Sequence, residues 1–243
     1  MPVSLLKRIL FSIIFCATFI TTVKVNAAGP VTHLYFADFW LKANAINLDE
    51  TEKKIFFAGT LFPDIRYLGV IRRSETHPKK VSLSHLKESC KKDPFTCGIY
   101  LHSYIDMERI KFVKSYKISR HLTTIPHTLR DKFLKFLEDE LFAESTNTND
   151  TLLSLNHVYP QEVSHGVKEH DVRRWHRYLQ AYLAQHPIDS LETASLVKKR
   201  LFGLDAGMIN KLVQLINAKK ELPAFQKYAE ALRERLEKKL SSK

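Results

Sequence analysis

The sequence is poor in the residues that build loop-rich, cystine-rich or β-sheet proteins. Its 243 residues include only 7 Gly, 9 Pro and 3 Cys, which excludes collagen-like, low-complexity and disulfide-scaffold chains. No stretch shows clear two-residue alternation of apolar and polar side chains, the pattern of half-buried strands. With 44% apolar and 26% charged residues, the chain can bury a full core, and one large domain is the simplest organisation.

Acidic residues are also scarce relative to basic ones. Asp and Glu number 26 against 38 Lys and Arg, a formal net charge of +12. Such an excess indicates an anionic partner, and lipid head groups, nucleic acids and phosphoesters all remain open.

The N-terminal segment lacks an apolar run long enough to span a membrane. Lys7 and Arg8 precede the apolar residues 9–23, which are fewer than the 18 that a spanning helix needs. Small residues follow, ending in Val-Asn-Ala, so we predict a signal peptide over residues 1–27 and a mature chain of residues 28–243. The expected location is therefore secreted or periplasmic. An uncleaved N-terminal anchor is the alternative.

Cysteine usage agrees with such a location. Removing the leader also removes Cys16 and leaves Cys90 and Cys97 as the only thiols. In an oxidising compartment we expect these two to form a disulfide. A cysteine-based zinc site is the alternative, but the spacing of the two residues matches no usual zinc motif.

Apolar residues recur at helical spacing along most of the chain. Thr32 can cap a helix over residues 33–44, and Pro63 should end an apolar helix over residues 55–65. The polar segment 144–150 should be the most exposed loop. The fold class is therefore all-α. Further helices are predicted over residues 95–110, 129–142, 171–185, 189–202, 205–219 and 223–241.

The last predicted helix is amphipathic and basic. One face carries Phe225, Tyr228, Leu232, Leu236 and Leu240, and Lys and Arg occupy the others. Such a helix can lie on an anionic membrane surface. Core packing with a solvated back is the more common use of this pattern, and we favour it.

Residues able to bind a metal ion gather in the first half of the chain, beside apolar sequence. His33, Asp64 and His77 each stand next to helix-forming segments, and His102 lies four residues before Asp106. That spacing places imidazole and carboxylate on one helix face. Imidazole nitrogen and carboxylate oxygen are the ligands that zinc takes when thiolate is absent.

The same four-residue spacing occurs twice more. His127 precedes Asp131, and His165 precedes Glu169. A single pair of this kind is weak evidence, since an exposed His with an acid one turn away usually forms a surface hydrogen bond.

Four segments together resemble one known family. They read THLYFADFWL, FFAGTLFPDI, SETH and GIYLHSYID in order, within residues 29–142. This series is similar to the zinc-dependent phospholipase C family, which includes the catalytic domain of the phospholipase D that cleaves glycosylphosphatidylinositol anchors. Phe-Pro-Asp and Gly-x-x-x-His-x-x-x-Asp are its most discriminating parts. The resemblance implies one all-α, multi-helix domain of the type shared with three-zinc nucleases, with up to three zinc ions in a cleft.

The resemblance also implies roles for the residues of the motifs. His33 would be the N-terminal imidazole ligand, and Asp64 would bridge two zinc ions and act as the catalytic carboxylate that orients or deprotonates the attacking water. The remaining ligands implied are His77, His102 and Asp106.

A further ligand pair is expected from the family pattern. His127 and Asp131 match it best in order and distance, with His165 and Glu169 as the rival pair. The chain departs from the family because no His follows shortly after Asp106, so we expect two or three zinc ions. His121 is an additional candidate metal ligand. The residues near the ligands that could supply charge for the phosphate are Arg66, Arg72, Arg73, Lys79 and His85.

The sequence thus predicts a secreted zinc-dependent phosphodiesterase that hydrolyses phospholipids. Its partner would be a phospholipid or another phosphodiester, with peripheral contact to a membrane surface and no obligate protein partner. A single-strand nuclease is less favoured, because such nucleases begin their mature chain with Trp and this chain would begin near Ala28. A non-catalytic metal- or lipid-binding relative is the other alternative.

Overall fold

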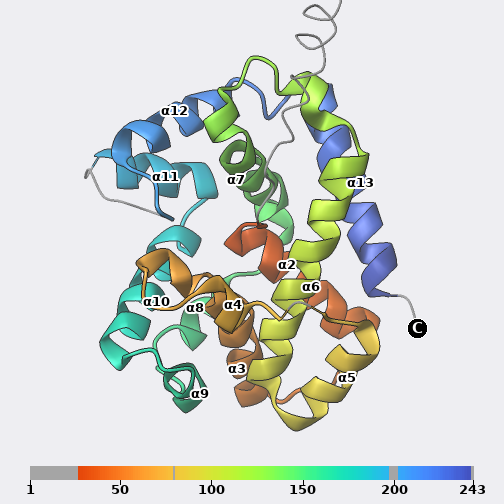
Figure 1. The fold of residues 1–243 in the computed structure, drawn as a ribbon, viewed down its shortest axis with the longest axis vertical. Coiled ribbons are helices and arrows are strands. Elements are labelled where there is room, and N and C mark those ends of the chain that lie inside the picture. The colour runs from red at the N-terminus through yellow and green to blue at the C-terminus, as the bar shows by residue number, and fades with distance from the viewer. Residues whose placement is uncertain (1–26, 79, 197–201, 242–243) are drawn as a thin grey trace, which may run out of the picture.

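All regular structure in the described part of the chain is helical (Figure 1). The computed structural model describes residues 27–78, 80–196 and 202–241. The all-α prediction is confirmed there. Except for Ala27, the predicted signal peptide lies outside these ranges, and no described helix is long and apolar enough to cross a membrane. The α-helices are α2 (Pro30–Ala43), α3 (Glu50–Leu61), α4 (Arg73–Thr76), α5 (Leu83–Lys92), α6 (Pro94–Ser115), α7 (Arg130–Phe142), α8 (Asn149–Ser154), α9 (Pro160–Ser164), α10 (Glu169–Leu183), α11 (Pro187–Leu196), α12 (Ala206–Asn217) and α13 (Pro223–Leu240).

Helix α2 lies at the centre of the arrangement and contacts α3, α6, α7, α10 and α13 (Figure 1). Its apolar side chains are buried, among them Phe36 and Trp40. Helix α2 starts earlier than predicted, because Gly29 and not Thr32 is the residue before its first turn. The Thr32 backbone N–H and hydroxyl both donate to Asp139 on α7, at 2.8 and 2.7 Å. A carboxylate from a distant helix therefore caps α2, which sequence proximity could not reveal.

Two glycines allow α3 and α6 to cross closely. A Cβ atom at Gly59 would lie 2.2 Å from the Phe95 carbonyl oxygen, and one at Gly98 would lie 2.3 Å from that of Phe56. Any larger residue would push the two backbones apart. This crossing brings the end of α3 against the N-terminal part of α6.

The segment after α3 follows the prediction in part. Helix α3 begins at Glu50, capped by Asp49, and is followed by a 3-10 helix, η1 (Phe62–Leu68), which contains Pro63. Sequence periodicity missed the short helices α4, α8 and α9, and also α5. The predicted disulfide between Cys90 and Cys97 is present and joins α5 to α6.

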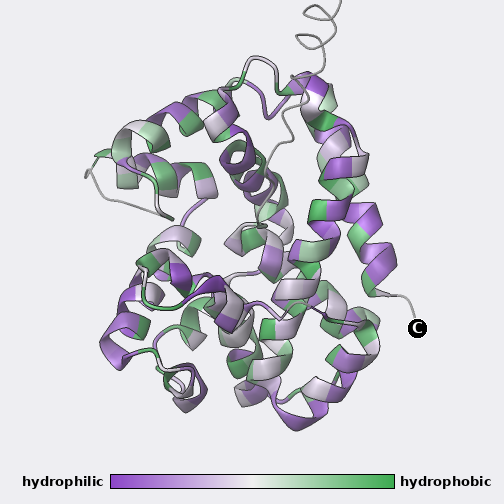
Figure 2. Cartoon of the chain, in the orientation of Figure 1, coloured by the Kyte–Doolittle hydropathy of each residue, from purple (hydrophilic) through white to green (hydrophobic). Residues whose placement is uncertain are grey.

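Core packing is confirmed for α13, because all five of its stripe residues are buried. Most helices carry both hydrophilic and hydrophobic residues (Figure 2).

A buried ion pair lies within the core. Arg109 donates to Glu138 at 2.5 Å, and the Tyr228 hydroxyl donates to the same carboxylate at 2.6 Å. Helices α6, α7 and α13 are thereby joined through a buried ion pair.

Two remaining predictions concern loops and boundaries. Segment 144–150 is mostly exposed, but it contains the end of a 3-10 helix, η4 (Ala143–Ser145), and the first residues of α8. The helix predicted over residues 189–202 corresponds to α11, and residues 197–201 lie outside the described ranges.

Candidate metal centre

Five predicted ligand residues converge from separate elements. His33 comes from α2, Asp64 from η1, His77 from the residue after α4, and His102 and Asp106 from α6. All five are buried. Their ligand atoms form two groups, each within 4.8 Å: one of His33, His102 and Asp106, the other of Asp64, His77 and His102. The described residues thus contain side chains that could hold a metal ion.

The close crossing of α3 and α6 orients His102. Its Nδ1 lies 2.9 Å from the Thr60 carbonyl oxygen, which can only accept a hydrogen bond. Nδ1 therefore carries the proton, and Nε2 presents a lone pair to the centre. Nε2 is buried and makes no hydrogen bond. A backbone carbonyl that fixes a ring in this way is a common support for a metal-binding His.

His77 is held in the same tautomer by a different partner. Its Nδ1 lies 2.9 Å from the Thr76 hydroxyl, and that hydroxyl donates to the Pro63 carbonyl oxygen at 3.2 Å. The Thr76 oxygen can then only accept from His77. The buried Nε2 of His77 makes no hydrogen bond and faces Asp106 at 3.6 Å.

His33 completes the imidazole cluster. Its ring stacks on His102 with a centroid separation of 3.7 Å, and neither ring nitrogen makes a hydrogen bond. Its Nε2 lies 3.4 Å from Asp106 Oδ1. A buried nitrogen without a partner is costly, and a metal ion would offset that cost.

Asp106 is the carboxylate shared among the imidazoles. Oδ1 faces His33, and Oδ2 lies 3.6 Å from His77 Nε2 and 3.7 Å from His102 Nε2. Arg73 lies 2.9 Å from Oδ2, and the Ala28 backbone N–H donates to Oδ1 at 2.8 Å. Burial alone would raise the pKa of Asp106, but the surrounding donors and cations hold it well below the usual range.

Asp64 has different neighbours. Its Oδ1 lies 3.0 Å from Arg66, and its Oδ2 lies 3.3 Å from the Lys135 ammonium. Burial opposes ionisation, yet the charges of Lys135 and Arg66 lower the pKa of Asp64. Both oxygens therefore lie beside a cation, although Oδ1 makes no hydrogen bond.

Two of the imidazoles are neutral at physiological pH. Burial, reinforced by the nearby Arg73 charge, lowers the pKa of His77 to about 4. Burial, with a further contribution from His33, lowers the pKa of His102 well below its ordinary value. Neutral imidazole is the form that ligates metal. The donor set of neutral nitrogens and ionised carboxylates therefore fits a zinc-type ion.

The other predicted ligands do not reach this centre. His127 is exposed at the start of a 3-10 helix, η3 (His127–Leu129), and neither it nor Asp131 belongs to either ligand group. His165 and Glu169 are also exposed; the His165 ring packs against aromatic residues and Glu169 pairs with Arg173.

Of the basic residues and further histidines predicted to lie near the site, some contact the centre and others do not. Arg66 and Arg73 contact the centre, as expected. His121 instead packs against the Phe225 ring, and His85 packs against Tyr100. Arg72 is exposed, and Lys79 lies outside the described residues. Spacing of His and acid along one helix was therefore insufficient to choose among three similar pairs.

Sequence reasoning missed Lys135. This lysine lies in the middle of α7 between Leu134 and Phe136, and all three side chains are buried. A lysine at an otherwise apolar part of a helix was a weak signal, since most lysines project into solvent.

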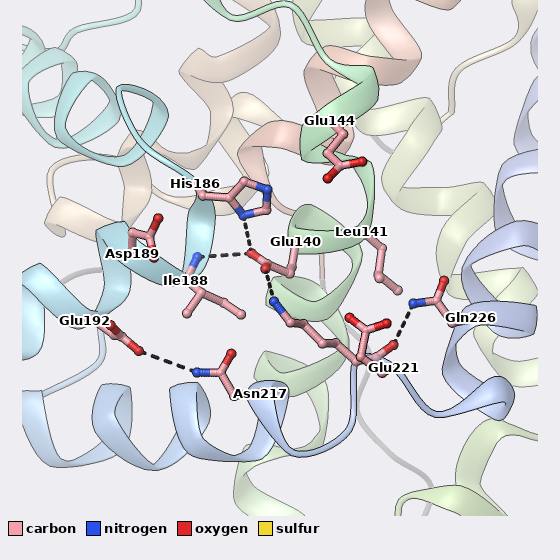
Figure 3. Close-up of a pocket in the computed structure, with 11 residues that line it drawn as sticks. Glu140, Leu141, Glu144, His186, Ile188, Asp189, Glu192, Asn217, Glu221 and Gln226 are labelled. Carbon is pink, nitrogen blue, oxygen red and sulfur yellow. Dashed lines mark hydrogen bonds and ion pairs between the residues drawn. The ribbon is translucent and has the colours of Figure 1, made fainter.

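A concavity outside the candidate metal centre lies between α7, α11 and α12 (Figure 3). Its volume is about 550 Å³, and five of its eleven lining residues are acidic. Glu140, its buried carboxylate, accepts from His186 and Lys220, both at 2.8 Å, and from the Ile188 backbone N–H at 3.2 Å. We call it the Glu140 pocket. Its lining acids are Glu140, Glu144, Asp189, Glu192 and Glu221.

No protein-family model, curated protein or solved structure matches the chain.

Proposed function

We propose that the protein is a secreted or periplasmic zinc-dependent phosphodiesterase that hydrolyses phospholipids. The observation that carries this proposal is the convergence of His33, His77 and His102, buried and with unpaired nitrogens, on two ionised carboxylates. The order of these residues along the chain also matches the phospholipase C motifs.

The metal would be held by the three imidazoles together with Asp64 and Asp106. Bound zinc supplies Lewis-acid polarisation of a phosphoryl oxygen and lowers the pKa of water towards about 7.

Cationic side chains supply the second part of the chemistry. Arg66, Arg73 and Lys135 each contact one of the two carboxylates. The Arg73 side chain is 40% exposed, whereas Asp106 beside it is buried. Arg73 therefore marks the side from which a substrate can approach, and its guanidinium can bind a phosphodiester oxygen through paired N–H groups.

Asp64 keeps the role of orienting the attacking water. Its lowered pKa keeps it ionised at neutral pH. An ionised carboxylate fixed by Lys135 and Arg66 can accept a hydrogen bond from the attacking water and hold that water in line with phosphorus.

A lipid is favoured over a nucleic acid by the motif resemblance. The net charge of +12 suits either anionic surface. A non-catalytic metal-binding protein is the second candidate, and it is favoured by one observation: cations already occupy positions beside both carboxylates.

The test combines metal content with turnover on the purified mature chain. We expect elemental analysis to find bound zinc. We also expect the chain to release the phosphorylated head group from phosphatidylcholine vesicles, and a chelator to stop that release. Replacing His102 by Ala should abolish bound zinc and reduce turnover by more than about 100-fold, because outer-shell changes alone cost 10- to 100-fold.

Matched controls use histidines outside the centre. His127→Ala and His165→Ala should retain zinc and turnover, since both rings are exposed. Hydrolysis of single-stranded DNA without hydrolysis of lipid would favour the nuclease instead. Bound zinc without turnover on either substrate would favour the binding protein, and a chain without zinc would overturn the metal centre.

A further inference from the structure

Lys135 is a buried cation fixed beside the metal centre. Its side chain is 1% exposed, and its ammonium lies 3.3 Å from both Asp64 Oδ2 and the Tyr67 hydroxyl. The ammonium also lies over the Tyr67 ring at 4.9 Å and the Phe202 ring at 5.4 Å. These contacts leave the charge no exposed position to occupy, so it stays with Asp64.

We propose that Lys135 takes the place of a second metal ion, so that the centre binds one zinc ion per chain and not the two or three expected from the family resemblance. This inference rests on the proposed zinc function and specifies the composition of its site.

The donor atoms support a single ion. The two ligand groups share His102, and only its Nε2 is available because Nδ1 binds Thr60. One nitrogen lone pair can ligate one ion. A second ion would therefore depend on Asp64 and His77, and Lys135 lies beside Asp64 Oδ2.

The local charge supports the same conclusion. Three cationic side chains, Arg66, Arg73 and Lys135, already contact the two carboxylates. Each further divalent ion would add two positive charges to a buried region, where uncompensated charge is unfavourable.

The expected ligand pair that precedes Lys135 in the chain does not reach the centre. Lys135 lies four residues after Asp131 on α7. The expected ligand pair at His127 and Asp131 would have brought additional donors from this segment, yet neither residue joins a ligand group. Helix α7 contributes an ammonium to the centre and no metal ligand.

The decisive measurement is the number of zinc ions per chain after zinc saturation and removal of weakly held ions. We expect one ion for the unaltered chain and for Lys135→Arg, which keeps the positive charge. Lys135→Met removes that charge and frees Asp64 Oδ2, so we expect its zinc content to rise from one to two ions per chain.

Lys132→Met is the matched control. Lys132 lies on the same helix and over the same Tyr67 ring at 5.0 Å, but it makes no ion pair with Asp64. Its zinc content should stay at one. Circular dichroism establishes that each variant is folded, and the unaltered chain remains decisive if Lys135→Met is not.

Two or three ions on the unaltered chain would overturn the role of Lys135 while leaving the zinc phosphodiesterase intact. A Lys135→Met chain that still binds one ion would also overturn it. A chain that binds no zinc would overturn both this inference and the proposed function.

Discussion

The candidate metal centre and the Glu140 pocket both contain His and acidic side chains, and both involve α7. In the pocket, hydrogen bonds from His186, Lys220 and a backbone N–H satisfy the buried Glu140 (Figure 3). In the centre, the Nε2 atoms of His77 and His102 have no hydrogen-bond partner. The difference teaches that abundance of ligand-type residues does not define a metal site. A metal site is indicated instead by buried ligand atoms that have no hydrogen-bond partner.

The largest difference between the two regions is expected in acid, where groups of the candidate metal centre should lower the unfolding free energy of the metal-free protein. The pKa of His77 is lowered to about 4, against 6.5 for an ordinary His. Between these values the unfolded chain binds a proton that the folded chain does not, so the unfolding free energy falls as pH falls. The loss should be about 3 kcal/mol from pH 6.5 to pH 4, at about 1.4 kcal/mol per pH unit.

Chemical denaturation across that range measures the slope. His102 acts in the same direction, since its pKa is also lowered. Asp64 and Asp106 lose their stabilising ionisation only below about pH 4, the ordinary range of an unfolded Asp. His77→Gln should therefore flatten the curve between pH 6.5 and 4. An unchanged slope in that variant would place the acid sensitivity elsewhere.

Support of His77 by Thr76 should have the next largest effect. Thr76→Val keeps the side-chain shape but removes the oxygen that accepts from His77 Nδ1. Zinc affinity should fall about 10- to 100-fold, the usual cost of removing a hydrogen bond that orients a ligand. Competition with a chelator of known affinity provides the measurement.

Thr60→Val is a closely matched control for that change. The Thr60 hydroxyl is also buried and donates to the Phe56 carbonyl, while the Thr60 backbone oxygen serves His102. This variant loses a hydroxyl but keeps the imidazole support, so its zinc affinity should stay close to that of the unaltered chain. Equal losses in both threonine variants would show that only general packing matters.

The smallest effect is expected in the Glu140 pocket. Glu140→Gln weakens the pairs with His186 and Lys220, whose side chains are 39% and 29% exposed and can be solvated. Destabilisation should be about 1 kcal/mol, as for a partly exposed charged hydrogen bond, with zinc content unchanged. Thermal unfolding and elemental analysis check the two parts. Loss of zinc would mean that the two regions are coupled.

The predictable parts of the site were those encoded within one helix. His102 and Asp106 are four residues apart, so any helix places them on one face. The disulfide between Cys90 and Cys97 joins residues that are near in sequence. The capping of α2 by Asp139 depends on α7, more than a hundred residues away, and local pattern placed the cap wrongly at Thr32.

Sequence by itself determined the helical class, the buried stripe of α13 and the identity of five ligand-type residues in the first half of the chain. Only the tertiary structure decided that neither His127 with Asp131 nor His165 with Glu169 joins His102 and Asp106, whose place depends on the glycine-mediated crossing of α3 and α6. It also brought Lys135 to Asp64. Spacing fixes which side chains share a helix face, whereas packing between distant helices fixes what that face meets.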